Sequence, residues 1–169
     1  MKKARPVVVV MGSDSDLPAL KGALDTLDAF GVGYDLRVLS AHRTPADVHD
    51  FAVGAAKAGF RVIIAAAGGA AHLAGVIASL TTIPVIGVPI ETRAFSGLDS
   101  LLSTVQMPAG VPVATVAVGS AGATNAALLA VQILALGDSK LTKKLLDYRS
   151  RQVEKVRAKD RKVRASKSR

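Results

Sequence analysis

The 169-residue sequence has no cysteine, no tryptophan and only three histidines, and aromatic residues make up 4% of it. The absence of cysteine excludes disulfide bonds and thiolate metal sites. Because aromatic residues are so scarce, the core must be built from Ala, Val, Leu and Ile, and half of all residues are hydrophobic. The length fits one domain, and the abundance of apolar residues favours contacts between subunits.

The sequence also lacks a long uninterrupted apolar segment. Residues 62–80 come nearest, but Gly68, Gly69 and His72 interrupt them, so no segment makes a persuasive membrane span. The apolar run at residues 7–11 is too short for a signal peptide. We therefore expect a cytoplasmic protein that has no membrane partner.

Acidic residues are scarce at the C-terminal end, which carries the whole net charge of +9. Residues 1–139 contain nine Lys or Arg and ten Asp or Glu, whereas residues 140–169 contain thirteen basic residues and three acidic ones. A tail of this kind is most simply a solvated charged helix, so nucleic acid is not the expected partner. A nucleic-acid-binding module remains the alternative from a different functional class.

Short β-branched runs alternate along the chain with helical patterns of apolar residues. Strands are predicted over residues 5–11, 34–39, 61–66, 84–88 and 113–118. Helices are predicted over residues 17–30, 45–59, 70–80, 98–105 and 123–136. The alternation predicts βαβ units with right-handed crossovers, and therefore a three-layer α/β/α sandwich around a five-stranded parallel sheet.

The last two helical segments have unusual surfaces. The helix at residues 123–136 is apolar nearly all the way round, which predicts that another subunit covers part of it. A final helix is predicted from Asp138 to about Lys162, with a narrow apolar stripe. The sequence thus predicts a single domain over residues 1–148 and a basic, partly disordered C-terminal helical extension over residues 149–169.

Two of the three histidines follow predicted strands. His42 comes just after the strand at residues 34–39, and His72 follows the small-residue run at 65–71. Open α/β sheets build their active sites at such strand ends. Imidazole titrates near neutrality and can both donate and accept a proton, so the pattern points to acid–base chemistry on a small molecule. His49 falls on the outer face of a predicted helix and is interpreted as a surface residue.

Two polar stretches could hold a phosphate. Gly-Ser-Asp-Ser-Asp at residues 12–16 lies between a strand and a helix, where backbone N–H groups and the helix dipole favour an anion. It lacks the dinucleotide and Walker motifs, and an ordinary capping turn explains it equally well. In the stretch at residues 40–45, Arg43 can form two hydrogen bonds to a phosphate and Ser40 can add a hydroxyl. A surface turn with a solvated histidine is the alternative.

A third stretch, residues 66–73, consists mainly of alanine and glycine. Gly68 and Gly69 remove side-chain bulk, so a flat ligand can approach the backbone and a carboxylate can meet its N–H groups. Tight packing between subunits is the other interpretation, and the two are compatible. No spacing of His, Asp and Glu indicates a metal site, and no Gly-x-Ser-x-Gly motif indicates a serine nucleophile.

Seven motifs in unbroken order closely resemble the N5-carboxyaminoimidazole ribonucleotide mutases of purine biosynthesis. They are Val-Met-Gly-Ser-Asp-Ser-Asp (10–16), Ser-Ala-His-Arg-Thr-Pro (40–45), Ala-Gly-Gly-Ala-Ala-His-Leu (67–73), Pro-Val-Ile-Gly-Val-Pro (84–89), Ser-Gly-Leu-Asp-Ser-Leu (96–101), Val-Gln-Met-Pro (105–108) and Asn-Ala-Ala-Leu-Leu-Ala (125–130). The resemblance implies a flavodoxin-like fold, a homo-octamer, and conversion of N5-carboxyaminoimidazole ribonucleotide to 4-carboxy-5-aminoimidazole ribonucleotide. It implies no metal and no organic cofactor.

The resemblance also implies a role for each matching position. His42 matches the general acid–base. The phosphate-binding positions are Ser13, Ser40 and Arg43, and the ribose-contacting acid is Asp16. The wall around the base and its carboxylate is formed by Gly68, Gly69, His72 and Leu73.

A second branch of the same family carboxylates aminoimidazole ribonucleotide directly with CO₂. That branch resembles Ser-Ala-His-Lys and Ser-Asn in the corresponding stretches. This chain has Arg43 and Ala-Ala-His at residues 70–72, which resemble the mutase pattern. Direct carboxylation remains the alternative activity.

Overall fold

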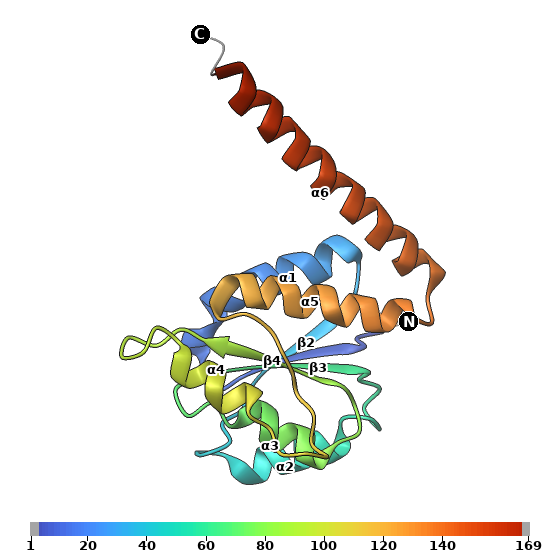
Figure 1. Cartoon of the computed structure of the whole chain (residues 1–169). Coiled ribbons are helices and arrows are strands. Elements are labelled where there is room, and N and C mark those ends of the chain that lie inside the picture. The colour runs from blue at the N-terminus through green and yellow to red at the C-terminus, as the bar shows by residue number, and fades with distance from the viewer. Residues whose placement is uncertain (1–3, 167–169) are drawn as a thin grey trace. The chain divides into compact units, whose positions relative to one another are not determined.

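The computed structural model describes residues 4–166 and contains a five-stranded sheet in the order β2-β1-β3-β4-β5 (Figure 1). The strands are β1 (Val7–Met11), β2 (Tyr34–Val38), β3 (Val62–Gly68), β4 (Val85–Ile90) and β5 (Ala114–Thr115). Every neighbouring pair is parallel. The predicted five-stranded parallel sheet is therefore confirmed.

Helices cover both faces of the sheet, as the three-layer prediction requires. In Figure 1, α1 (Leu17–Phe30) and α5 (Gly119–Ala135) lie on one face. On the other face lie α2 (Pro45–Gly54), α3 (Leu73–Leu80) and α4 (Leu98–Val105). The flavodoxin-like α/β/α architecture is confirmed.

The central strands form because their residues are apolar on both sides. All five residues of β1 are buried, and so are all six of β4. A parallel strand between two helical layers favours such continuous β-branched runs. Strand β2, in contrast, lies at the edge of the sheet and leaves Leu36 and Val38 about half exposed.

Several element boundaries differ from the prediction. Strand β5 has two residues instead of six, because the chain leaves β4 after Val116 N–H donates to the Gly87 carbonyl (3.1 Å). Gly119 (φ 71°) then turns the chain into α5, four residues before the predicted start at Ala123. Helix α2 ends at Gly54, and turns occupy the five residues up to Gly59.

The chain divides into two compact units after Ile133. The sequence predicted a boundary after residue 148. In the second unit, the Asp138 carboxylate accepts from the backbone N–H of Lys140 (2.9 Å) at the start of α6 (Ser139–Ser166). This helix is continuous to Ser166, four residues beyond the predicted end at about Lys162. The part of the predicted disorder that falls on residues 167–169 lies outside the described residues.

Some apolar side chains of the first unit have no cover within a single chain. Leu98, Leu102 and Val105 of α4 follow each other on one helix face, and each is about half exposed. Helix α5 buries one stripe against the rest of the unit, while Leu128 and Leu129 remain only partly covered. Within residues 4–166, none of the helices combines the length and the apolar character that crossing a membrane requires.

Candidate active site

A cavity of about 370 Å³ lies beyond the carboxyl ends of β1, β2 and β3. Three segments that follow these strands line it, because adjacent parallel strands end at the same edge of a sheet. Its lining residues are Gly12, Ser13, Asp16, Ser40, Ala41, His42, Arg43, Ala67, Gly68, Ala70, His72 and Leu73.

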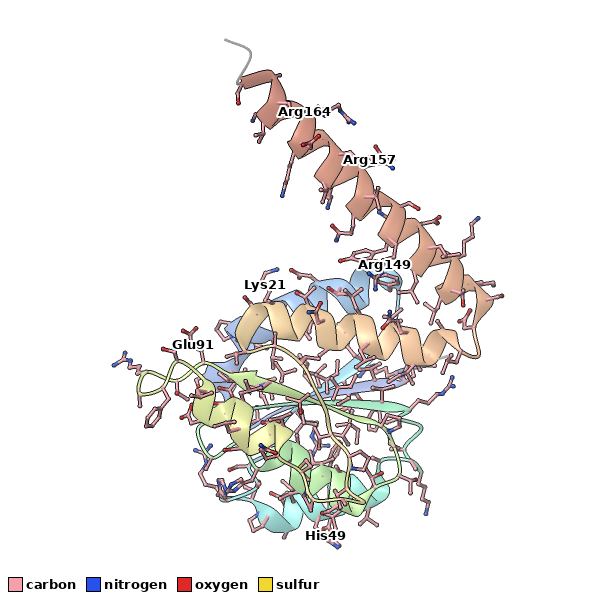
Figure 2. All side chains as sticks on the ribbon, viewed as in Figure 1. Lys21, His49, Glu91, Arg149, Arg157 and Arg164 are labelled. Carbon is pink, nitrogen blue, oxygen red and sulfur yellow. The ribbon has the colours of Figure 1, made fainter. Side chains whose placement is uncertain are left out.

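All but one of the predicted site residues are brought together in this lining. Gly69 is the exception, since it lies between two lining residues, Gly68 and Ala70, without lining the cavity itself. The third histidine, His49, is exposed on the outer side of α2, away from the sheet (Figure 2). It does not contribute to the cavity.

The segment after β1 forms a capped turn. Ser13 caps the short 3₁₀ helix η1 (Asp14–Asp16), because its hydroxyl accepts from Ser15 N–H (3.3 Å) and Asp16 Oδ2 accepts from Ser13 N–H (3.3 Å). The capping turn considered as an alternative therefore exists, and two of its residues also line the cavity.

Asp16 is a partly buried carboxylate at the cavity edge. Burial raises its pKa above the usual value of 3.8, and Asp14 adds to the rise. Hydrogen bonds from Ser13 and Ser15 and the positive charge of Arg43 oppose that shift. A carboxylate at this position can accept hydrogen bonds from the hydroxyl groups of a ligand.

The Arg43 guanidinium is held between two of the segments. Its Nη2 donates to the Gly12 carbonyl (2.8 Å), and its Nε donates to the Ser40 hydroxyl (3.3 Å). The Ser40 hydroxyl also accepts from the Arg43 backbone N–H (3.2 Å). The remaining N–H groups of the guanidinium are available for an anion. An arginine fixed in this way is suited to bind a phosphate at the cavity edge.

His42 and His72 meet across the cavity. His42 Nε2 lies 2.9 Å from His72 Nδ1, and the two rings are edge-on at 78° with centroids 5.0 Å apart. In a hydrogen bond at this distance one of the two nitrogens donates and the other accepts, and the tautomers of the two rings decide which. The pair places a titratable group directly on the cavity.

The Gly68–Gly69 turn is fixed by residues that the sequence did not mark as part of the site. Gly69 N–H donates to the hydroxyl of Ser100 (2.9 Å), which in turn donates to the Ile90 carbonyl (2.6 Å). Ser100 belongs to the motif at residues 96–101, for which the sequence offered no role. The signal was therefore present, but its meaning depends on α4 lying beside β3 and β4.

The comparisons with known proteins identify the family. Residues 6–155 match the AIR carboxylase family. The chain belongs to that family. It is 55% identical to the N5-carboxyaminoimidazole ribonucleotide mutase of Brucella melitensis over 150 residues, which cover 89% of this chain and 93% of that protein. It is 52% identical to the Pyrococcus horikoshii protein of the same name over 164 residues, covering 96% and 92% of the two chains.

A solved protein structure has the same fold. The crystal structure of Treponema denticola PurE superimposes with a TM-score of 0.83 at 28% identity, covering 92% of this chain and 96% of that chain. The family resemblance stated from the seven motifs is thus confirmed. Among residues 4–166, no cluster of three or more His, Cys, Asp or Glu side chains is arranged to hold a metal ion.

Proposed function

We propose that this chain is an N5-carboxyaminoimidazole ribonucleotide mutase, which moves CO₂ from the exocyclic nitrogen of the substrate to ring carbon 4. The observation that carries the proposal is that one cavity combines a pair of histidines in contact, an arginine suited to phosphate and a wall of small residues. Membership of the AIR carboxylase family and more than 50% identity to two named mutases support it.

The ribonucleotide end of the substrate occupies the polar side of the cavity. Arg43, Ser40 and Ser13 bind its phosphate, and the Asp16 carboxylate accepts hydrogen bonds from the ribose hydroxyls. These contacts lie on the segments after β1 and β2. Because neither the phosphate nor the ribose reacts, this binding energy serves to orient the base beside His42.

His42 acts as general acid and then as general base. In the first step the carbamate C–N bond breaks, CO₂ departs, and the nitrogen takes a proton from His42 to become the amine. In the second step ring carbon 4 attacks CO₂ and forms the new C–C bond. That carbon then loses its hydrogen to His42 as a proton, which restores the ring and the histidine. No net proton is gained or lost.

The released CO₂ must stay in the cavity between the two steps. The apolar side of the cavity consists of small residues and one leucine, namely Ala41, Ala67, Gly68, Ala70 and Leu73. Holding CO₂ next to carbon 4 makes the second step effectively intramolecular, which raises its rate by orders of magnitude. His72 orients the His42 ring through the contact between the two side chains.

The alternative activity is direct carboxylation of aminoimidazole ribonucleotide with CO₂. The two are separated by supplying the purified protein first with N5-carboxyaminoimidazole ribonucleotide, and separately with aminoimidazole ribonucleotide plus bicarbonate. A mutase turns over the first substrate rapidly. Fast turnover with the second pair alone would overturn the proposal.

We also propose that the enzyme is a cytoplasmic homo-octamer, as the family resemblance implies. The exposed apolar face of α4, formed by Leu98, Leu102 and Val105, supports association of chains, because monomers rarely leave such a row uncovered. Light scattering on the purified protein tests the octamer. A monomeric mass at micromolar concentration would contradict it.

Nucleic acid is not a proposed partner. The side chains of Arg149, Arg157 and Arg164 extend from α6 (Figure 2), and every residue from 149 to 166 is exposed. Ion pairs within the helix, such as Arg157 with Glu154 (2.7 Å), are typical of a solvated charged surface.

A further inference from the structure

Ser100 lies in the first turn of α4, and its side chain is fully buried. A hydroxyl has one hydrogen to donate, and that hydrogen goes to the carbonyl of Ile90 at the end of β4 (2.6 Å). The oxygen then accepts from the N–H of Gly69, just beyond the end of β3 (2.9 Å). Ser100 therefore joins two strand ends through one atom.

Two further residues of α4 contact the segments that follow β3 and β4. The hydroxyl of Ser103 lies 2.7 Å from the Asp99 carbonyl and 3.3 Å from the Gly69 carbonyl, so the peptide groups on both sides of Gly69 are in contact with α4. The carboxylate of Asp99 accepts from the Thr92 hydroxyl (2.8 Å), which attaches the loop after β4 to the same helix turn.

The hydrogen bonds from α4 fix the position of the turn at Gly69. Gly69 has φ 68°, a left-handed conformation that favours glycine, and no atom lies within 4 Å of the position a Cβ would take. The next residues fold tightly, since Ala71 N–H donates to the Gly69 carbonyl and His72 N–H to the Ala70 carbonyl, both at 2.8 Å. The position of the Gly69 peptide therefore sets where Gly68, Ala70 and His72 face the cavity.

Helix formation alone does not explain a serine at this position. Serine is a poorer helix former than alanine, and a buried hydroxyl loses its water. Its neighbour one turn on, Thr104, is also buried, but its hydroxyl donates only to the Ser100 carbonyl within the same helix. Only the Ser100 hydroxyl contacts Gly69, whose neighbours Gly68 and Ala70 line the cavity.

We propose that Ser100 is a positioning residue that keeps the Gly68–Ala70 turn in place as the wall behind which released CO₂ is retained. The proposal rests on the proposed mutase function. When the wall is displaced, the first step still occurs, and the carbamate plus one proton yields the amine and CO₂. The CO₂ then escapes before carbon 4 attacks it, and aminoimidazole ribonucleotide is released.

The test is the ratio of escape to transfer in Ser100→Ala, measured with substrate labelled in its carboxylate carbon. Label lost as CO₂ is compared with label found in the carbon-4 product, after subtraction of spontaneous loss without enzyme. We expect the ratio to rise about tenfold or more, because displacing a reacting group by about 1 Å can reduce a rate by about a hundredfold. We expect KM to change little, since the phosphate contacts lie on other segments.

Thr104→Val is the matched control. It removes a buried hydroxyl from the same helix without touching Gly69, so it should lower the melting temperature and leave the ratio unchanged. An equal rise in both variants, or no rise in folded Ser100→Ala, would overturn the proposal. If Ser100→Ala does not fold, the ratio is measured in Ser103→Ala instead. That substitution removes only the longer of the two contacts between α4 and Gly69 (3.3 Å). A raised ratio supports the proposal, and an unchanged ratio refutes it.

The wild-type arm separates this inference from the proposed function. If wild-type enzyme transfers no label to carbon 4, the mutase assignment fails, whatever the variants do. If wild type transfers label and the variants do not alter the ratio, only the role of Ser100 fails.

Discussion

Replacing Arg43 by alanine should weaken substrate binding while leaving the chemical step almost intact. The guanidinium is anchored by the Gly12 carbonyl and the Ser40 hydroxyl, and Arg43 lines the cavity. A hydrogen bond to a charged group contributes about 1.5–3 kcal/mol. Each ~1.4 kcal/mol corresponds to a tenfold change in affinity. Because Arg43 is exposed and screened by solvent, we expect the lower part of that range, and therefore a KM increase of about 10- to 50-fold.

Steady-state kinetics across a range of ionic strengths measures this effect. The phosphate does not react, so kcat should stay within about threefold of wild type. Salt should raise KM in the wild type more than in Arg43→Ala, because screening weakens an interaction that the variant has already lost. Arg43→Lys keeps the charge but loses the planar fork, and should fall between the two.

The matched control is Arg37→Ala, in which the same charge is lost outside the cavity. The Arg37 guanidinium lies over the Phe51 ring, 5.8 Å from its centroid, and does not line the cavity. Its KM should equal that of the wild type. An Arg43→Ala enzyme whose KM stays within twofold of wild type, or one that loses kcat alone, would refute the assignment of Arg43 to the phosphate.

The other predictions concern the proton, the pH dependence, the fold and the tail. His42→Asn should lower kcat by about 10²- to 10⁴-fold, the range attributed to general acid–base catalysis, with an unchanged melting temperature; near-normal turnover would remove His42 from the mechanism. Burial raises the pKa of Asp16, so its carboxylate gains a proton at a higher pH than an ordinary aspartate does. KM should therefore rise as pH falls in the acid range. In Asp16→Asn, KM should not depend on pH in that range. Gly22→Ala should destabilise the protein by about 1–3 kcal/mol in urea denaturation, since the new Cβ would lie 2.5 Å from Thr124 Oγ1, whereas Gly54→Ala meets no atom within 4 Å and should not destabilise. Deleting residues 150–169 should leave kcat/KM unchanged, and a large loss of activity would show that α6 serves the site.

The sequence predicted the elements whose residues are determined locally. Helix α4 was predicted with the bounds it has, and α1 likewise, because apolar spacing and flanking glycines mark their ends. The buried strands β1, β3 and β4 were predicted from uninterrupted apolar runs. The short β5 was predicted too long, because the length of an edge strand depends on where its single partner stops pairing.

The contacts within the site depend on the order of the strands, which apolar periodicity does not reveal. His42 follows β2 and His72 follows β3, and they meet because β1 lies between these two strands and ends at the same edge. The contacts of Ser100 could not be predicted from the sequence for the same reason. A serine in a helical pattern gives no sign that its hydroxyl reaches the ends of two strands.

Two opposite sides of helix α4 make different contacts. Its inner side holds the Gly69 turn through Ser100, and its outer side presents Leu98, Leu102 and Val105 to solvent in a single chain. If a neighbouring subunit covers the outer side, we expect it also to stabilise the inner side. Dilution that separates subunits would then reduce the specific activity of each chain before the chain itself unfolds.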